Sequence, residues 1–348
     1  MKRRPIGYYV HHHGAGHRAR AAAIAAACDW PIVLLGTGMG ERGIDLPDDR
    51  PRSGRFDGDD AAHCRPAALH YAPLDHSGVR LRVARIAEWI AQERPALMVI
   101  DVSVEVAMLA RLASVPTIYV RLNGLRDDLP HLDAFRGAAA LLAPYHPATE
   151  PPGTPSWVRE KTCHFPGITA TAGTEIAMDR RILVVFGHGG APGDGALLAD
   201  AASACPEWEW RVIGPASLPA DGPANLVFAG WTNEPEREIA RAGVVVGAAG
   251  DGLVGAVMAA DRPFVCVPDD RPFGEQRATA GCLARLGAAV VSPTWPSAES
   301  WPALIDEALS QDGSARRALH GMHGARKAAA WLADHAAAMT LGDEEQAA

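Results

Sequence analysis

Apolar runs that lead through a glycine-rich turn into a helix constrain this chain more than any other feature. The first run, residues 5–12, leads through the turn at 14–16 into an alanine-rich helix predicted at 18–28. The second, at 243–246, leads into the glycine turn at 250–252. A strand, a glycine turn and a helix N-terminus gather free backbone N–H groups at one point, which favours an anion there.

The same alternation of strands and helices runs through both halves of the chain, which predicts βαβ units and mainly parallel sheets. Further strands are predicted at 31–35, 97–101, 116–120, 181–186, 209–213, 226–228, 264–267 and 288–291. Helices are predicted at 79–90, 104–113 and 315–339, the last with Leu319, Met322, Trp331 and Leu332 as candidate buried positions.

A length of 348 residues suggests two domains, and a proline-rich stretch at 144–166 interrupts the rhythm. We therefore expect an α/β protein with two doubly wound, Rossmann-like domains at 1–165 and 166–348, joined by a linker near 163–180. The last helix is free to pack back on the N-terminal domain. Ligands of such sheets sit at the carboxyl ends of the strands, so the two domains are expected to face one central cleft.

Composition excludes several classes of protein. The net charge of −8 argues against a nucleic-acid partner. No apolar run approaches 18 residues, so no transmembrane helix is expected, although Arg18, Arg20 and the basic start leave a peripheral membrane contact open. There is no signal-peptide pattern, and the six cysteines include no C-x-x-C pair, which predicts free thiols in the cytoplasm. The oligomeric state is open.

His17 stands where the first helix begins, at the mouth of the predicted cleft. A neutral imidazole there can take a proton from an acceptor hydroxyl, and the helix N-terminus favours the neutral form. Asp101 ends a neighbouring predicted strand and can orient the ring, as the carboxylate of a catalytic triad does. From the residues alone His17 is a general base, a ligand contact or a helix cap.

Other motifs favour neither a cofactor nor a metal. Residues 14–19 match the dinucleotide fingerprint G-x-G-x-x-G/A, but the strand at 31–35 lacks the acid that would hold the ribose. The consecutive histidines at 11–13 alternate faces on a strand, so they do not converge on an ion. The Asp57-Gly58-Asp59 triplet lies in a polar loop predicted at 41–66 and is a solvated charge run.

Three features of the second half face the predicted cleft. Gly187, His188, Gly189 and Gly190 follow a strand and let the backbone approach a diphosphate or a sugar, or form an ordinary tight turn. Trp231 follows the strand at 226–228 and either stacks on a nucleobase or packs in the core. Glu275 and Gln276 follow the anion turn by one helix and can reach a group attached to the anion.

The order of these motifs resembles the donor-binding region of a known family. The region carries, in sequence, Gly230-Trp231, the strand ending at Val246, Gly250-Asp251-Gly252, Pro263 to Pro268, Glu275-Gln276 and Leu286-Gly287-Ala288-Ala289. It is similar to GT-B glycosyltransferases of families 28 and 1, which include the peptidoglycan N-acetylglucosaminyltransferase and natural-product glycosyltransferases. The resemblance covers nearly the whole chain. His17 falls at the family's glycine-loop histidine, Asp101 at an acid often found near it, and the turn at 187–190 at the glycine turn opening the C-terminal domain.

The resemblance implies an inverting, metal-independent transfer from a UDP- or dTDP-type nucleotide-diphosphate sugar to a small-molecule or natural-product acceptor. It implies that Trp231 lies near the base, that Glu275 and Gln276 touch the sugar, and that the diphosphate is held by Gly250, Asp251, Gly252 and Leu253. The acceptor is expected near His13, Gly14, Ala15, Gly16 and Asn123, with His17 and Asp101 as the catalytic pair.

The chain departs from the family at the ribose. Many relatives carry a Glu in the helix after the glycine turn, where this sequence has Ala256. Two alternatives therefore stay open beside the transferase. One is a nucleotide-sugar hydrolase or 2-epimerase of the same fold, and the other is a catalytically silent protein that binds a nucleotide-sugar or an enzyme.

Overall fold

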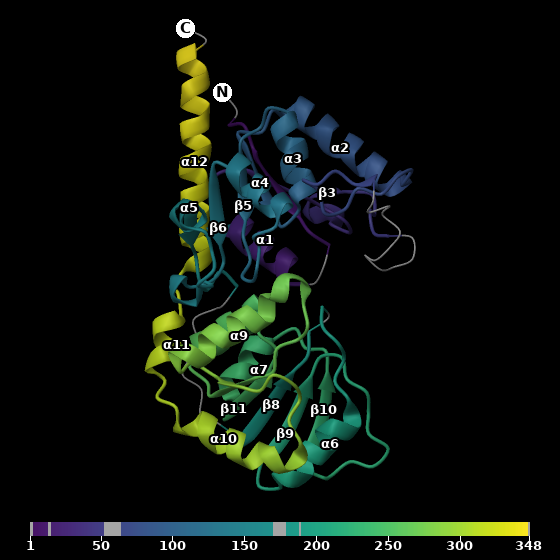
Figure 1. The fold of residues 1–348 in the computed structure, drawn as a ribbon, viewed down its shortest axis with the longest axis vertical. Coiled ribbons are helices and arrows are strands. Elements are labelled where there is room, and N and C mark those ends of the chain that lie inside the picture. Colours follow the sequence, from purple (N-terminus) through teal and green to yellow (C-terminus); the bar gives the residue numbers. More distant parts are fainter. Residues whose placement is uncertain (1–2, 13–14, 52–63, 170–178, 188, 347–348) are drawn as a thin grey trace.

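The computed structural model describes residues 3–12, 15–51, 64–169, 179–187 and 189–346. They form two lobes stacked along the long axis of the molecule, each built around one sheet (Figure 1). The two sheets and their interleaved helices confirm the expected two-domain α/β fold. The domain boundary at 165/166 stays a prediction.

The described strands of the N-terminal lobe form a seven-stranded sheet in the order β3-β2-β1-β4-β5-β6-β7. All of the pairings are parallel. The strands are β1 Ile6–Val10, β2 Ile32–Gly36, β3 Ile44–Asp45, β4 Leu97–Asp101, β5 Thr117–Val120, β6 Ala140–Ala143 and β7 Thr162–His164. The helices of this part of the chain are α1 Ala15–Ala27, α2 Ser77–Glu93, α3 Val104–Leu112, α4 Leu129–Gly137 and α5 Ser156–Lys161, with short 3-10 turns at Gly40–Arg42 and Pro147–Thr149.

The described strands of the C-terminal lobe form a six-stranded parallel sheet in the order β10-β9-β8-β11-β12-β13. The strands are β8 Arg181–Val185, β9 Glu209–Ile213, β10 Leu226–Gly230, β11 Val244–Gly247, β12 Phe264–Cys266 and β13 Val290–Val291. The helices are α6 Gly195–Ala204, α7 Pro235–Arg241, α8 Asp251–Ala260, α9 Glu275–Leu286, α10 Trp301–Ser310, α11 Ser314–Leu319 and α12 Gly324–Gln346, with 3-10 turns at Pro272–Gly274 and Ala298–Ser300.

The central strands are apolar on both faces because helices cover both faces of each sheet. In β1, Ile6, Tyr8 and Val10 pack into the core on one side, whereas Tyr9 packs into the core on the other. In β11 the alternation repeats, with Val244 and Val246 on one side and Val245 on the other. The continuous apolar runs seen in the sequence are thus the signature of buried parallel strands.

The last helix, α12, belongs in space to the N-terminal lobe. Ala328, Ala329, Leu332 and Ala336 share a buried cluster with the first strand and with α1, against which α12 packs. Figure 1 shows this helix in yellow, running alongside the N-terminal lobe while α10 and α11 lie in the other lobe. No described helix is long and apolar enough to cross a membrane.

The helix predicted at 315–339 is wrong as a single element, because the structure breaks it between α11 and α12. His323 has a φ of 62°, which a helix interior does not allow. Gly321 and Gly324 lie against the backbone of Pro166 and Gly167, so closely that a Cβ at either position would collide with it. Met322, in the break, is exposed rather than buried.

The region around the predicted linker holds more structure than expected. The sheet continues through β6 and β7, which the sequence did not reveal, and β7 occupies the start of the 163–180 stretch. The rest of that stretch lies mostly outside the described residues. In the loop predicted at 41–66, residues 52–63 lie outside the described residues, and the described part contains the short strand β3.

Candidate active site

Both sheets change direction at a point that carries predicted site residues. In the N-terminal lobe the chain first builds outward from β1 through β2 to β3, then continues on the other side of β1 from β4. His17 follows β1, and Asp101 is the last residue of β4. In the C-terminal lobe the same reversal separates β8 from β11, which lead to Gly187 and to α8. Such switch points are where doubly wound sheets bind ligands.

His17 and Asp101 form a hydrogen-bonded pair in the N-terminal lobe. The Nδ1 atom of His17 lies 2.9 Å from Oδ1 of Asp101, whose side chain is fully buried. An ionised carboxylate only accepts hydrogen bonds, so a neutral imidazole that donates to Asp101 carries its proton on Nδ1 and a lone pair on Nε2. That is the tautomer a general base needs.

Arg20, one helical turn after His17, completes this cluster. Its Nη2 group donates to both oxygens of Asp101, at 2.9 and 3.0 Å, and lies 3.0 Å from Nδ1 of His17. Burial alone would raise the pKa of Asp101, but Arg20 and His17 outweigh it and hold that pKa at about 2. Asp101 is therefore ionised at neutral pH, as the tautomer argument requires.

Three described contacts join the two lobes beside this cluster. Nη1 of Arg20 approaches Oδ2 of Asp251 at 3.9 Å. Arg126, in the loop between β5 and α4, pairs with Glu275 at the start of α9, with Nη2 and Oε2 3.0 Å apart. The amide of Leu125 donates to the carbonyl of Phe273 at 2.8 Å. The two switch points consequently face each other.

The first turn of α8 has the properties of an anion site. Its N-cap residue, Gly250, has no side chain to cap the helix, and no described group takes the amides of residues 251–253. Asp251 is the first residue of the helix, and burial raises the pKa of its carboxyl group. The carboxylate of Asp251 thus lies at the end of a helix that attracts negative charge, next to a cation from the other lobe.

Some of the remaining donor-side residues are exposed, and others contact neighbouring protein groups. Gly187, Gly252 and Trp231 are exposed, and the 55% exposure of Trp231 excludes a core position for it. Leu253 is partly buried against the core of this lobe. Gly189 and Gly190 lie beside Arg271 and Asp269, while His188 is outside the described residues.

Gln276 and Glu275 are held by protein groups in this conformation. Gln276 is buried, and its Oε1 accepts from the amides of Ala249 and Asp269 at 3.2 and 2.7 Å, so it fixes the loop that precedes α8. Glu275 pairs with Arg126, and burial together with the nearby Asp251 carboxylate raises the pKa of its carboxyl group.

On the acceptor side, Asn123 has no exposed surface in this conformation. Its Nδ2 donates to the carbonyl of Thr149 and its Oδ1 accepts from the amide of Gly124, so it shapes the loop after β5. Its place near the acceptor stays a prediction. Gly16 is exposed at the start of α1. His13 and Gly14 lie outside the described residues, as does the side chain of Ala15.

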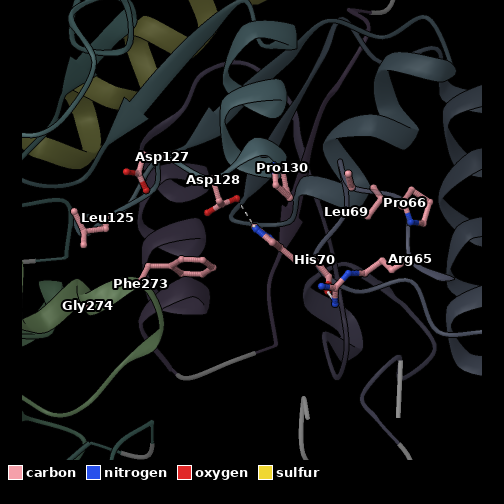
Figure 2. A pocket seen from close by; sticks show the side chains of 11 residues that line it. Arg65, Pro66, Leu69, His70, Leu125, Asp127, Asp128, Pro130, Phe273 and Gly274 are labelled. Carbon is pink, nitrogen blue, oxygen red and sulfur yellow. Dashed lines mark hydrogen bonds and ion pairs between the residues drawn. The ribbon is translucent and has the colours of Figure 1, made fainter. Parts of the chain in front are cut away.

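A cavity of about 690 Å³ opens beside the interlobe contacts. Its walls include Leu69, His70, Asp127 and Pro130 of the N-terminal lobe and Phe273 of the other lobe. Figure 2 shows the ring of Phe273 pointing from its loop toward Asp128 and His70. A volume of this size is within the range of small-molecule sites in proteins.

His70, Asp128 and His131, at the edge of this cavity, have ligand atoms close enough to hold a metal ion. Their hydrogen bonds explain them otherwise. The carboxylate of Asp128 caps α4 and accepts hydrogen bonds from Nδ1 of His131 at 2.7 Å and from Nε2 of His70 at 2.9 Å. Arg126 donates to Nε2 of His131 at 3.1 Å, which keeps the ring proton on the Nδ1 that a metal would need. In this conformation the trio forms a hydrogen-bonded cap at the start of α4.

Several residues of this region were not predicted from the sequence, namely His70, Arg126, Asp128, His131 and Phe273. Arg20 was predicted only as part of a basic surface. For Arg20 a signal was available, because residues three apart on a helix share a face and His17 is three residues earlier. For the others no local pattern distinguishes them from surface charges.

These features define the class of fold as GT-B, and solved structures share it. No protein-family model and no curated protein matches the chain in sequence. The spinosyn forosaminyltransferase SpnP is 11% identical, with 97% of this chain and 100% of that chain covered and a TM-score of 0.67. The glycotransferase of kitacinnamycin is 13% identical, with 96% and 100% covered and a TM-score of 0.66. MurG of Acinetobacter baumannii is 15% identical, with 95% and 99% covered and a TM-score of 0.62.

At these identities the likeness establishes the two-lobed GT-B fold over nearly the full length of the chain. The chemistry has to be argued from the site itself, because one fold hosts many reactions.

Proposed function

We propose that the protein is an inverting glycosyltransferase, which moves a sugar from a UDP- or dTDP-type nucleotide-diphosphate sugar to a hydroxyl or amine of a small-molecule acceptor. The observation that carries the proposal is the position of the His17–Asp101 pair, whose partner Arg20 faces Asp251 at the N-terminus of α8. A base on one lobe and an anion site on the other are the two parts that such a transfer needs. Two of the structural neighbours named above, a forosaminyltransferase and a glycotransferase, are transferases by name, which supports the proposal.

The residues of the site divide the reaction between the lobes. Nε2 of His17 accepts the proton of the acceptor hydroxyl while the acceptor oxygen forms a bond to the anomeric carbon. The bond from that carbon to the diphosphate oxygen breaks on the opposite side, so the configuration inverts. The electron pair stays on the diphosphate, where the amides at the start of α8 and the helix dipole stabilise its charge.

Other residues bind the remainder of the donor. Trp231, exposed after β10, offers a face on which the nucleobase stacks. Glu275 binds the sugar hydroxyls after it leaves Arg126, and Gln276 keeps the α8 loop in place through its Oε1 atom. Ala256 provides no polar side-chain group for the ribose, so ribose recognition differs from that of relatives with a Glu at this position.

Replacing His17 with alanine tests the proposal. General bases contribute about 10²–10⁴-fold, so turnover of the His17→Ala variant should fall by that order while nucleoside diphosphate affinity persists. Release of nucleoside diphosphate from UDP- and dTDP-sugars is measured with and without a panel of small-molecule acceptors. His335→Ala, in α12, is the matched control and should keep wild-type turnover.

The outcomes separate the alternatives. Unchanged turnover in His17→Ala removes His17 from the chemistry. Release of nucleoside diphosphate in the absence of an acceptor indicates a nucleotide-sugar hydrolase. A 2-epimerase would convert the donor into another nucleotide-sugar, would release no nucleoside diphosphate and would transfer no sugar to an acceptor. A wild-type protein that binds no nucleoside diphosphate is a silent partner protein instead.

A further inference from the structure

We propose that Arg20 of the N-terminal lobe is a ligand of the donor diphosphate, and that it exchanges the Asp251 carboxylate for the phosphate oxygens when the donor binds. The inference rests on the proposed function, because it concerns the same donor site. It adds a positive charge from the lobe that is otherwise expected to serve the acceptor.

Arg20 is a buried cation whose hydrogen-bonding capacity is only partly used. Its exposure is 5%, and Nη2 is taken up by Asp101. Within the part of the chain that the structure describes, its buried Nε–H has no hydrogen-bond partner. Nη1 comes no closer than 3.9 Å to Asp251, which is too long for a hydrogen bond. A buried guanidinium with unused donors is costly unless a further acceptor joins it.

Of the Arg20 donors, Nη1 is the one that faces the first turn of α8. Nη1 approaches the carboxylate of Asp251, the residue that begins the helix. The amides of the same turn have no side-chain cap, since Gly250 is the N-cap residue. Two independent sets of donors, the helix amides and the guanidinium, therefore meet at one point from opposite lobes.

A diphosphate satisfies these donors better than the Asp251 carboxylate does. It carries more negative charge and more acceptor oxygens, and the planar fork of an arginine matches phosphate oxygens in a bidentate way. Asp251 competes for the same positive charge. Removing its charge should strengthen diphosphate binding, and removing the fork of Arg20 should weaken it.

The exchange also connects the two halves of the site. The same guanidinium holds Asp101, which orients His17, through Nη2. Its Nη1 then contacts the leaving group, whose charge grows as the bond to the sugar breaks. Arg20 supplies in this way a fixed positive charge at the leaving group.

A purely structural Arg20, serving only as the counter-ion of buried Asp101, is the competing explanation. Isothermal titration of UDP, dTDP, GDP and ADP distinguishes the two. The proteins compared are the wild type, Asp251→Asn, Arg20→Lys and Arg20→Gln. The matched control is Arg18→Gln, because Arg18 lies on the same helix but donates to the Thr37 carbonyl of its own lobe.

We expect Asp251→Asn to bind the preferred nucleoside diphosphate about tenfold more tightly than the wild type, and Arg20→Gln to bind it at least about tenfold more weakly. Arg20→Lys, which keeps the charge but loses the fork, should lie between them, and Arg18→Gln should match the wild type. Thermal unfolding of each ligand-free variant records the structural part of the effect separately. If Arg20→Gln does not fold, Asp251→Asn and Arg20→Lys decide the question.

The results distinguish failure of this inference from failure of the proposed function. A wild type that binds one of the nucleotides, with Asp251→Asn and Arg20→Lys binding it equally well, overturns the role of Arg20 alone. Weaker binding by Asp251→Asn overturns it too. A wild type that binds none of the four nucleotides overturns both proposals.

Discussion

Replacing Asp101 with asparagine separates what one buried carboxylate contributes to stability from what it contributes to turnover. Asp101 has no exposed surface, and its charge faces Arg20 and His17. Its pKa is lowered from 3.8 to about 2, a difference that corresponds to about 2 kcal/mol of preference for the charged form. Because the substitution also leaves Arg20 buried without its counter-charge, the expected loss of unfolding free energy is about 3–5 kcal/mol.

The assay is urea unfolding at pH 7, extrapolated to water, for the wild type and Asp101→Asn. Asp133→Asn is the control, because Asp133 pairs with Arg136 on the exposed side of α4 and such pairs contribute at most about 1 kcal/mol. An acidic group whose pKa is lower in the folded state than in the unfolded chain stabilises the folded protein when the pH is above the unfolded pKa. The Asp101 contribution is thus complete above about pH 4 and is lost as the pH falls toward about 2. The difference between wild type and variant should narrow over that window.

Turnover gives a second readout of the same substitution. An asparagine does not impose the Nδ1–H tautomer on His17, so the rate should fall by about 10²–10⁴-fold even where the variant is fully folded. An Asp101→Asn protein with the stability and acid profile of the wild type would refute the charge network. Full turnover in a folded variant would refute the tautomer argument.

Three further substitutions test other parts of the structure. Trp231→Ala should weaken nucleoside diphosphate binding by about 1–3 kcal/mol in titration calorimetry and leave the thermal midpoint unchanged, since the ring is exposed; equal affinity would remove the base contact. Leu332→Ala, in α12, should lower the urea unfolding free energy by about 2–5 kcal/mol, and a variant as stable as the wild type would contradict the packing of α12 on the N-terminal lobe. Burial, and after it Arg126, lowers the pKa of His131 to about 4, so as the pH falls the unfolded chain takes up this proton before the folded protein does. The free energy of unfolding of the wild type should therefore fall by about 3 kcal/mol between pH 6.5 and 4. In His131→Asn the free energy of unfolding should change less steeply with pH over this range, and the same pH dependence as the wild type would show that His131 is not buried as a neutral ring.

Much of the fold could be predicted because its strands are buried on both faces. The strand predicted at 97–101 coincides with β4, since a continuous apolar run between helices has few other uses. The strand predicted at 209–213 coincides with β9, where buried Trp210 and Val212 alternate with Glu209 and Arg211. The sequence did not predict β6 and β7, because both strands are short. β6 ends just before the proline-rich stretch at 144–166, and β7 lies inside it, where the composition resembles a linker. The break between α11 and α12 depends on backbone contacts with Pro166 and Gly167, about 150 residues earlier, which no local pattern records.

The site shows the same division between local and distant information. His17, Asp101 and Asp251 could be singled out because each stands at the carboxyl end of a predicted strand, where the topology gathers ligands. The pairing of Arg126 with Glu275 joins residues 149 positions apart and exists only once the two lobes are placed. The hydrogen bond from Asn123 to the carbonyl of Thr149 likewise joins residues 26 positions apart and could not be predicted from a local pattern.

The return of α12 to the first lobe has a consequence for synthesis on the ribosome. The chain emerges from its N-terminus, so the strands from β1 to β7 appear long before the helix that covers Ile6 and Ile24. During that interval one apolar layer of the N-terminal lobe is open to water. The C-terminal lobe does not wait for α12, so we expect it to complete its folding before the N-terminal lobe does. Nascent-chain proteolysis at successive lengths should therefore find the later-made lobe protected before the earlier-made one.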